Sequence, residues 1–166
     1  MPELTKTKEP DEKRKKEMFK LYKNICTRSF SYNKKRMLIS TILGYEDWAW
    51  RVVGISKEAL IRCKRNDYNR PKGLVRDHIN ERKETYKRLI EEQPPEENWW
   101  KYFWKRDKTR LLTSEGHINK NIFNPDDLIE INWTEGYFQS RGYAGFNYRK
   151  SIEGEFVKQL CDENNI

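Results

Sequence analysis

The sequence predicts a domain in which helices pack around a few short strands. Two short apolar runs, Leu74–Ile79 and Thr109–Leu112, have the length of strands, and each leads to one of the two histidines in the chain. Elsewhere apolar residues recur at the three- and four-residue spacing of a helix, as in the series Met18, Leu21, Tyr22 and Ile25. Residues 73–120, which contain both runs and both histidines, hold the candidate chemistry.

The length and charge of the chain limit its class. At 166 residues it is expected to form one domain with a substantial core, because a domain of about 150 residues buries roughly two-thirds of its unfolded surface. The formal net charge is +8, and six Trp, nine Tyr and seven Phe make up much of the apolar content. Basic residues displace counterions from phosphates and rings stack on bases, so this composition suits nucleic acid. A charge-rich solvated surface explains it equally well.

Residues 1–36 carry most of the excess positive charge. They hold twelve Lys or Arg against five Asp or Glu, a net charge of +7. We expect residues 1–10 to be disordered and Asp11 to cap a helix. This basic arm either follows a phosphate backbone or presents a solvated helix face. The remaining residues, 37–166, are expected to form a single domain.

Structural zinc and a membrane span are not expected. Cys26, Cys63 and Cys161 lie far apart without a Cys-x-x-Cys pair, which supports neither a disulfide framework nor a zinc site with four ligands. The N-terminal region lacks the apolar stretch of a signal peptide, and no run approaches the roughly 18 apolar residues of a membrane span. We therefore expect a cytoplasmic protein.

Two further strands and a helix are expected before the first histidine. The apolar run Met37–Leu43 predicts a short strand. The aromatic segment Trp48–Val53 predicts a second extended stretch, which Gly54 is expected to end. Ser56 then has the position and side chain of a helix cap.

Two helices are expected to form an insertion between the histidine-bearing runs. Asn80 is placed to cap a helix over residues 81–93, which Pro94 ends. Pro95 opens a second helix, whose apolar stripe has the spacing of a buried face and consists of Trp99, Trp100, Phe103 and Trp104.

Three helix starts follow the second run. Thr113 or Ser114 is placed to cap a helix that carries His117. Asn124–Asp127 has proline at the first helical position and acidic residues in the first turn. Ser151 is expected to open a terminal helix.

The Asp77-His78 pair and His117 have the side chains that phosphodiester hydrolysis requires. Asp77 offers a hard oxygen ligand for Mg²⁺ or Mn²⁺, and His117 could add a nitrogen ligand. His78 is the natural general base, since an imidazole is largely neutral at pH 7. Arg76 and Lys120 could hold phosphate oxygens. In an arbitrary protein, however, an Asp-His pair in a strand is more often a structural pair.

A family resemblance rests on these motifs. The run Leu-Val-Arg-Asp-His-Ile at Leu74–Ile79, followed by Arg-Leu-Leu-Thr-Ser-Glu-Gly-His-Ile-Asn-Lys at Arg110–Lys120, resembles the HNH endonucleases, nearest to small phage-type members. The resemblance covers about 48 residues, 73–120, with an insertion inside it. It implies an α+β fold that is mainly helical around a small antiparallel β-hairpin and one helix, the ββα-metal motif.

The resemblance also implies an activity and a site. It implies a DNA endonuclease that uses one divalent metal, Mg²⁺ or Mn²⁺, with Asp77 and His117 as ligands and His78 as base. The family's middle Asn, which orients the base, has no counterpart here. Asp107 is expected to take its place by accepting a hydrogen bond from the His78 imidazole; otherwise the site binds without cutting.

Other readings stay open at this point. A non-catalytic nucleic-acid-binding module with a degenerate HNH site is the main alternative, and an interaction or structural protein is a third. The oligomeric state is open, a homodimer included. The basic residues expected to contact DNA are Arg76, Lys108, Arg110, Lys120, Arg141 and Arg149.

Overall fold

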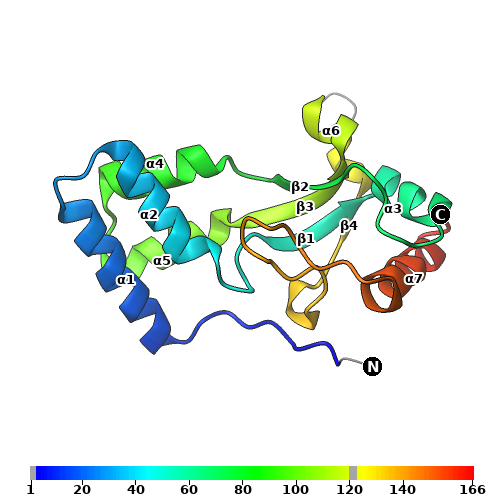
Figure 1. Cartoon of the computed structure of the whole chain (residues 1–166), viewed down its shortest axis with the longest axis horizontal. Helices are drawn as coiled ribbons and strands as arrows, with labels where there is room; N and C mark the ends of the chain where they lie inside the picture. The colour runs from blue at the N-terminus through cyan, green and yellow to red at the C-terminus, as the bar shows by residue number, and fades with distance from the viewer. Residues whose placement is uncertain (1–2, 120–122) are drawn as a thin grey trace.

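The chain folds into an α+β structure in which helices surround a small mixed sheet (Figure 1). A computed structural model describes residues 3–119 and 123–166. The α-helices are α1 (Glu12–Thr27), α2 (Tyr32–Gly44), α3 (Lys57–Arg65), α4 (Arg82–Glu92), α5 (Glu96–Arg106), α6 (Ser114–Ile118) and α7 (Glu155–Glu163). The strands are β1 (Arg51–Ser56), β2 (Leu74–His78), β3 (Lys108–Thr113) and β4 (Leu128–Glu130). Short helical turns cover Pro125–Asp127, Trp133–Glu135 and Lys150–Gly154.

The predicted hairpin is present, with α4 and α5 inserted between its strands. β2 and β3 pair antiparallel, with Asp77 opposite Arg110 and His78 opposite Thr109. The sheet extends beyond the hairpin in the order β2-β3-β1-β4. β1 runs parallel to β3, and β4 runs antiparallel to β1. α6 follows β3 directly and stands at the end of the hairpin (Figure 1).

Two cores flank the sheet. α1, α2, α4 and α5 gather at one end of the molecule, while α3 and α7 lie at the other (Figure 1). The first core is rich in aromatic rings, as predicted for α5, and the Tyr22 and Trp99 rings stack at 5.4 Å. The second core packs α3 and α7 against β1 and β3 through residues such as Leu60 and Val157. Because α1 contributes Met18 and Tyr22 to the first core, the basic N-terminal helix is packed into the fold.

Residues 3–11, before α1, have a defined position, contrary to the disorder expected over residues 1–10, of which the first two lie outside the described residues. Thr7 is buried, its N–H donates to the Thr134 carbonyl at 3.1 Å, and its hydroxyl accepts from Gln139 at 2.7 Å. Farther along, the Glu9 carboxylate accepts from the Trp100 indole at 2.6 Å. Polar composition predicted disorder because it gave no sign of these distant partners.

Residues 37–43 form part of α2, so the predicted strand is wrong. The Ser31 hydroxyl caps the helix by accepting from the Lys34 N–H. Ile39 and Leu43, four residues apart, both face the core, while Met37 is exposed. A short apolar run fits either period, and here the cap and the helical spacing decide the outcome.

The strand expected over residues 48–53 is shifted toward the C-terminus. β1 begins at Arg51 and continues through Gly54 to Ser56. Gly54, which was expected to end the strand, lies inside it and pairs with β4. A Cβ atom at Gly54 would approach Leu128 Cγ to 2.8 Å, so the absence of a side chain allows β4 to lie this close.

The predicted caps have mixed outcomes. Asp11, Ser56 and Thr113 each accept a hydrogen bond from an N–H in the first turn of α1, α3 and α6, which confirms them. Asn80 instead donates to the Arg106 carbonyl at 3.4 Å, and α4 follows Glu81 without a side-chain cap. Residues 124–127 form only a short helical turn, and the terminal helix begins at Lys150 with a π-type turn.

Candidate active site

The hairpin and α6 bring Asp77 and His117 into direct contact. Asp77 Oδ1 and His117 Nδ1 are 2.7 Å apart. The Asp77 side chain is 2% exposed, whereas that of His117 is about half exposed. α6 follows Thr113, which pairs with Leu74 at the start of β2, and the helix packs back on β2 far enough for His117 to reach Asp77. Two residues separated by 40 positions, which the HNH resemblance implies as ligands of one metal, therefore lie in contact.

Arg110 completes this polar cluster. Its Nε donates to Asp77 Oδ2 at 2.9 Å, and the two residues are directly opposite in the β2–β3 register. The Arg110 guanidinium also lies 4.3 Å from the Phe123 ring. This buried, charge-assisted pair neutralises Asp77 and occupies the carboxylate oxygen that does not face His117. Arg110 was predicted as a nucleic-acid contact, and in this structure it is tied to Asp77.

His78 leaves β2 on the opposite side from Asp77. Consecutive side chains of a strand point to opposite faces, and the His78 ring lies edge-on to the Trp50 ring at 5.7 Å. Burial, together with the positive charges of Arg82 and Arg76, lowers the pKa of His78 to about 4. The nearby Asp77 acts in the opposite direction. At pH 7 the His78 imidazole is therefore neutral, the form that a general base requires.

Asp107 does not take the role expected of it. Its Oδ2 accepts from the Trp50 N–H at 2.9 Å, and among the described residues no hydrogen bond joins it to His78. Burial raises the pKa of Asp107 to about 6, against the lowering effects of the Trp50 N–H and of Arg51. Asp107 thus orients the Trp50 backbone, and Trp50 in turn packs on His78.

Arg76 faces the His78 side of the sheet and not the Asp77–His117 pair. Its guanidinium donates to the Ser140 hydroxyl and to the Gly142 carbonyl, each at 3.2 Å. It also lies 4.9 Å from the Trp50 ring. Burial lowers the pKa of Arg76 to about 10. Its contacts hold the turn at residues 140–142 against the sheet.

The other predicted DNA contacts are dispersed. Lys108 is half-buried and lies beside Arg51 and Trp104. Arg141 is exposed. The Arg149 guanidinium is bound to the buried Glu153 carboxylate at 3.1 Å. Lys120 lies outside the described residues.

Arg82 is a site residue that the sequence analysis missed. Its guanidinium lies 4.2 Å from the Trp50 ring, and its Nη2 donates to the Ser40 hydroxyl at 2.8 Å. It is the leading charge among those that lower the pKa of His78. The sequence offered only its position four residues after His78, which does not reveal that α4 turns it back toward the sheet.

The donors available for a metal are few. Within residues 3–119 and 123–166, no group of three or more His, Cys, Asp or Glu side chains is arranged to hold an ion. Asp77 and His117 offer one carboxylate and one imidazole, a donor set that divalent cations accept when water or substrate oxygens complete the shell. A metal at this pair would have only two protein ligands among the described residues, so water or substrate oxygens would have to fill the rest of its shell.

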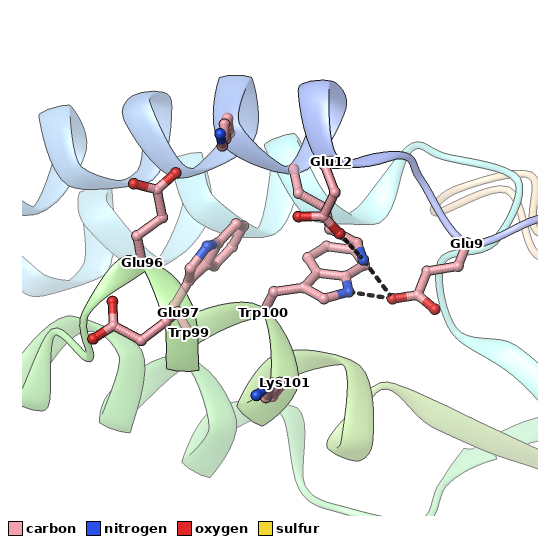
Figure 2. A pocket seen from close by; sticks show the side chains of 9 residues that line it. Glu9, Glu12, Glu96, Glu97, Trp99, Trp100 and Lys101 are labelled. Carbon is pink, nitrogen blue, oxygen red and sulfur yellow. Dashed lines mark hydrogen bonds and ion pairs between the residues drawn. The ribbon is translucent and has the colours of Figure 1, made fainter.

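A separate pocket of about 500 Å³ lies between α1 and α5. Figure 2 shows Trp99 and Trp100 beside it, with the Glu9 carboxylate contacting the Trp100 indole. Lys15 also pairs with Glu9 at 2.9 Å and with Glu12 at 3.1 Å. Its lining residues include none from β2, β3 or α6, and several of its charges neutralise one another. We assign it no part in the chemistry of the histidines.

Comparisons with known proteins identify no relative, so the function has to be argued from the geometry of the site. In the described part of the chain, no helix is both long and apolar enough to span a bilayer. No family model, curated protein or solved structure matches this chain.

Proposed function

We propose that the protein is a metal-dependent DNA endonuclease of the HNH type. The observation that supports this proposal most is the contact of 2.7 Å between Asp77 and His117, which joins the end of β2 to α6. The order strand, strand, helix around this contact is the order that the HNH resemblance implies.

Asp77 and His117 are the proposed ligands of one Mg²⁺ or Mn²⁺ ion. Such an ion would stabilise the charge that develops on the phosphate and on the leaving oxygen. Arg110 lies next to the carboxylate and would hold it in place, since their bond is buried and charge-assisted. The half-exposed His117 keeps the pair accessible to a substrate.

His78 is the proposed general base, the role that the HNH resemblance implies. Because its ring leaves β2 on the face opposite Asp77, this role requires a phosphate that reaches both faces at the end of β2. A pKa of about 4 keeps it neutral over the whole physiological range. A base with this pKa is weaker than an ordinary histidine, but it is never lost to protonation near pH 7. General-base catalysis typically contributes about 10² to 10⁴-fold to a rate.

The first test is plasmid cleavage with Mg²⁺, with Mn²⁺ and with EDTA. Wild type is expected to nick or linearise the plasmid only with metal. His78→Ala should reduce the rate about 10² to 10⁴-fold, because the base is removed. Asp77→Asn and His117→Ala should reduce it as well and should raise the metal concentration needed.

A matched control guards against a trivial loss of folding. Lys158→Ala removes an exposed charge on α7 and should cut like wild type. Circular dichroism of each variant reports whether the fold is kept. The wild-type rate should fall at acidic pH, because a general base must be neutral and metal ligands must be deprotonated. Metal-independent cutting, or full activity of folded His78→Ala, would contradict the proposal.

The second candidate is a nucleic-acid-binding module without catalysis. Two observations favour it: Arg110 neutralises Asp77, and the Asp107 carboxylate is bound to Trp50 and not to His78. This candidate predicts salt-dependent DNA binding with no cutting of any substrate in any metal. The plasmid assay separates the two.

A further inference from the structure

A basic cleft opens between α2 and α4, next to the His78 side of the sheet. Its volume is about 410 Å³. Arg36 comes from α2, and Arg82 and Lys83 come from the first turn of α4. Ser40, Tyr86 and Tyr143 supply hydroxyl groups to the same lining. Among the described residues that line it, none carries a negative charge.

Among the described residues, the three cations of the basic cleft form no salt bridge, although the Arg82 charge acts on the buried Asp107 carboxylate. Arg14, Arg62, Arg88, Arg110 and Arg149 all pair with carboxylates elsewhere in the molecule. In the described part of the chain, Arg36, Arg82 and Lys83 make no such pair. Like charges gathered in one cleft repel one another, and a bound anion relieves that repulsion.

A buried polar atom of the basic cleft lacks a partner: Arg82 Nε forms no hydrogen bond among the described residues. Tyr86 is 3% exposed, and burial raises the pKa of its hydroxyl, an effect that hydrogen bonding with Ser40 and Arg82 partly offsets. A buried polar group without a partner is costly, so native structures rarely keep one without reason. Glu81 provides no side-chain cap for α4, which leaves the positive end of that helix open beside Arg82 and Lys83.

Two exposed tyrosines border the basic cleft. Tyr45 is 63% exposed and Tyr143 is 55% exposed, and their rings meet edge-on at 5.6 Å. The Tyr143 hydroxyl hydrogen-bonds the Ser40 hydroxyl, which fixes its ring over the cleft. Large rings that stay exposed beside cations are typical of surfaces on which unpaired bases stack.

The basic cleft adjoins the proposed catalytic base through Trp50. The Trp50 ring is 5.3 Å from Tyr143 and 5.7 Å from His78. The Arg82 guanidinium lies over the same ring at 4.2 Å. A strand held in the cleft would therefore lie on the side of the sheet that carries His78.

We propose that the basic cleft and the Tyr45–Tyr143 pair bind an unpaired DNA strand. Arg36, Arg82 and Lys83 contact its phosphates, and the two tyrosine rings stack on its bases. This inference rests on the proposed function and names its substrate class: DNA with a single-stranded segment. Backbone charge and ring stacking recognise such a strand without reading its sequence.

The experiment is fluorescence anisotropy of a labelled oligothymidylate in EDTA, with a duplex of equal length for comparison. Wild type should bind the single strand more tightly than the duplex. Arg36→Ala/Lys83→Ala should weaken single-strand binding about tenfold or more, because two phosphate contacts are lost. The matched control, Arg65→Ala/Lys158→Ala, removes the same charge from exposed sites on α3 and α7 and should bind nearly as wild type.

The stacking contact has its own pair of variants. Tyr45→Ala should weaken binding roughly 5- to 100-fold, the range expected for one base–aromatic stack. Tyr45→Phe keeps the ring and should restore binding. Tyr45 is exposed, so neither variant should disturb folding.

Several outcomes would overturn this inference. These are equal binding of single strand and duplex, equal losses in the cleft variant and its matched control, or tighter binding of an oligouridylate. Failure of the nuclease proposal is distinguishable, because binding is measured in EDTA, where no metal-dependent cutting takes place. Single-strand binding without cutting would reject catalysis alone, and plasmid cutting without single-strand preference would reject the cleft alone.

Discussion

Two buried aspartates of this protein have very different partners. Asp77 is paired with Arg110 and His117 through both of its oxygens. Asp107 has a backbone N–H as its partner, that of Trp50, whose φ of 50° is unusual for a residue with a side chain. The Thr109 hydroxyl donates to the Trp50 carbonyl at 2.7 Å, so the backbone N–H and C=O of Trp50 are both hydrogen-bonded. The Asp107 carboxylate therefore stabilises a strained residue on which His78 packs.

Replacing Asp107 with Asn should change how stability depends on pH. Burial raises the pKa of Asp107 from 3.8 to about 6, so between these values the folded state binds more protons than the unfolded state. In wild type, the extra proton bound by the folded state stabilises the fold at low pH, and this stabilisation is lost as pH rises through about 6. The amide side chain of the Asp107→Asn variant does not titrate, so the variant loses no such stabilisation. The unfolding free energy of the variant relative to wild type should rise by about 1–3 kcal/mol between about pH 4 and pH 7.

Urea unfolding of both proteins across this range measures the difference. His78 acts with the opposite sign, because its folded pKa of about 4 lies below its ordinary 6.5. Its contribution is present at neutral pH and is lost as pH falls from 6.5 toward 4. It is common to both proteins and cancels in the comparison. A pH-independent difference would mean that Asp107 titrates like an exposed carboxylate.

At the scale of elements, the close approach of β4 to β1 depends on one glycine. Gly54 pairs with Glu130, and a Cβ on Gly54 would lie 2.8 Å from Leu128 Cγ and 2.9 Å from its Cδ2. Separations this short force either the side chain or the strand to move. β4 is only three residues long, so it has few hydrogen bonds with which to resist.

Gly54→Ala should therefore destabilise the fold by about 1–3 kcal/mol, the usual cost of overpacking. Urea unfolding is the measurement. Leu128→Ala removes the atoms that would clash, so Gly54→Ala should cost much less in that background. Additive effects of the two substitutions would show that Gly54 and Leu128 are not coupled.

At the scale of the whole molecule, positive charge is distributed unevenly. The net charge is +8, yet many basic side chains in the structure are paired with carboxylates. The basic cleft concentrates charge without such pairing. Association with nucleic acid should therefore depend more on the cleft than on the total charge of the chain.

The salt dependence of single-strand binding tests this distribution. Each phosphate contact on a single strand makes the slope of log K, where K is the binding constant, against log salt concentration more negative by about 0.7. Three contacts therefore predict a slope of about −2. Arg36→Ala/Lys83→Ala should bring the slope to about −0.7. Anisotropy titrations at several salt concentrations provide the slopes. An unchanged slope in the cleft variant would place the phosphate contacts elsewhere.

The sequence alone determined the elements whose signals are local. The caps at Asp11, Ser56 and Thr113, and the two strands that lead to His78 and His117, are confirmed. A helix cap depends on one side chain and on a backbone N–H within three residues of it, so the adjacent sequence is sufficient to predict the cap. The antiparallel pairing of those strands was expected from the HNH resemblance and is present in the structure.

Only the tertiary structure decided the rest. The run at residues 37–43 could be strand or helix until the core selected the Ile39–Leu43 face. The insertion of β1 between β3 and β4 depends on residues far apart in the chain. Asp107, expected to hold His78, instead holds Trp50, 57 positions away. The basic cleft likewise joins Ser40 to Tyr143 across 103 positions. Local sequence determines backbone preference, but burial and long-range contacts decide which side chains meet and what charge they carry.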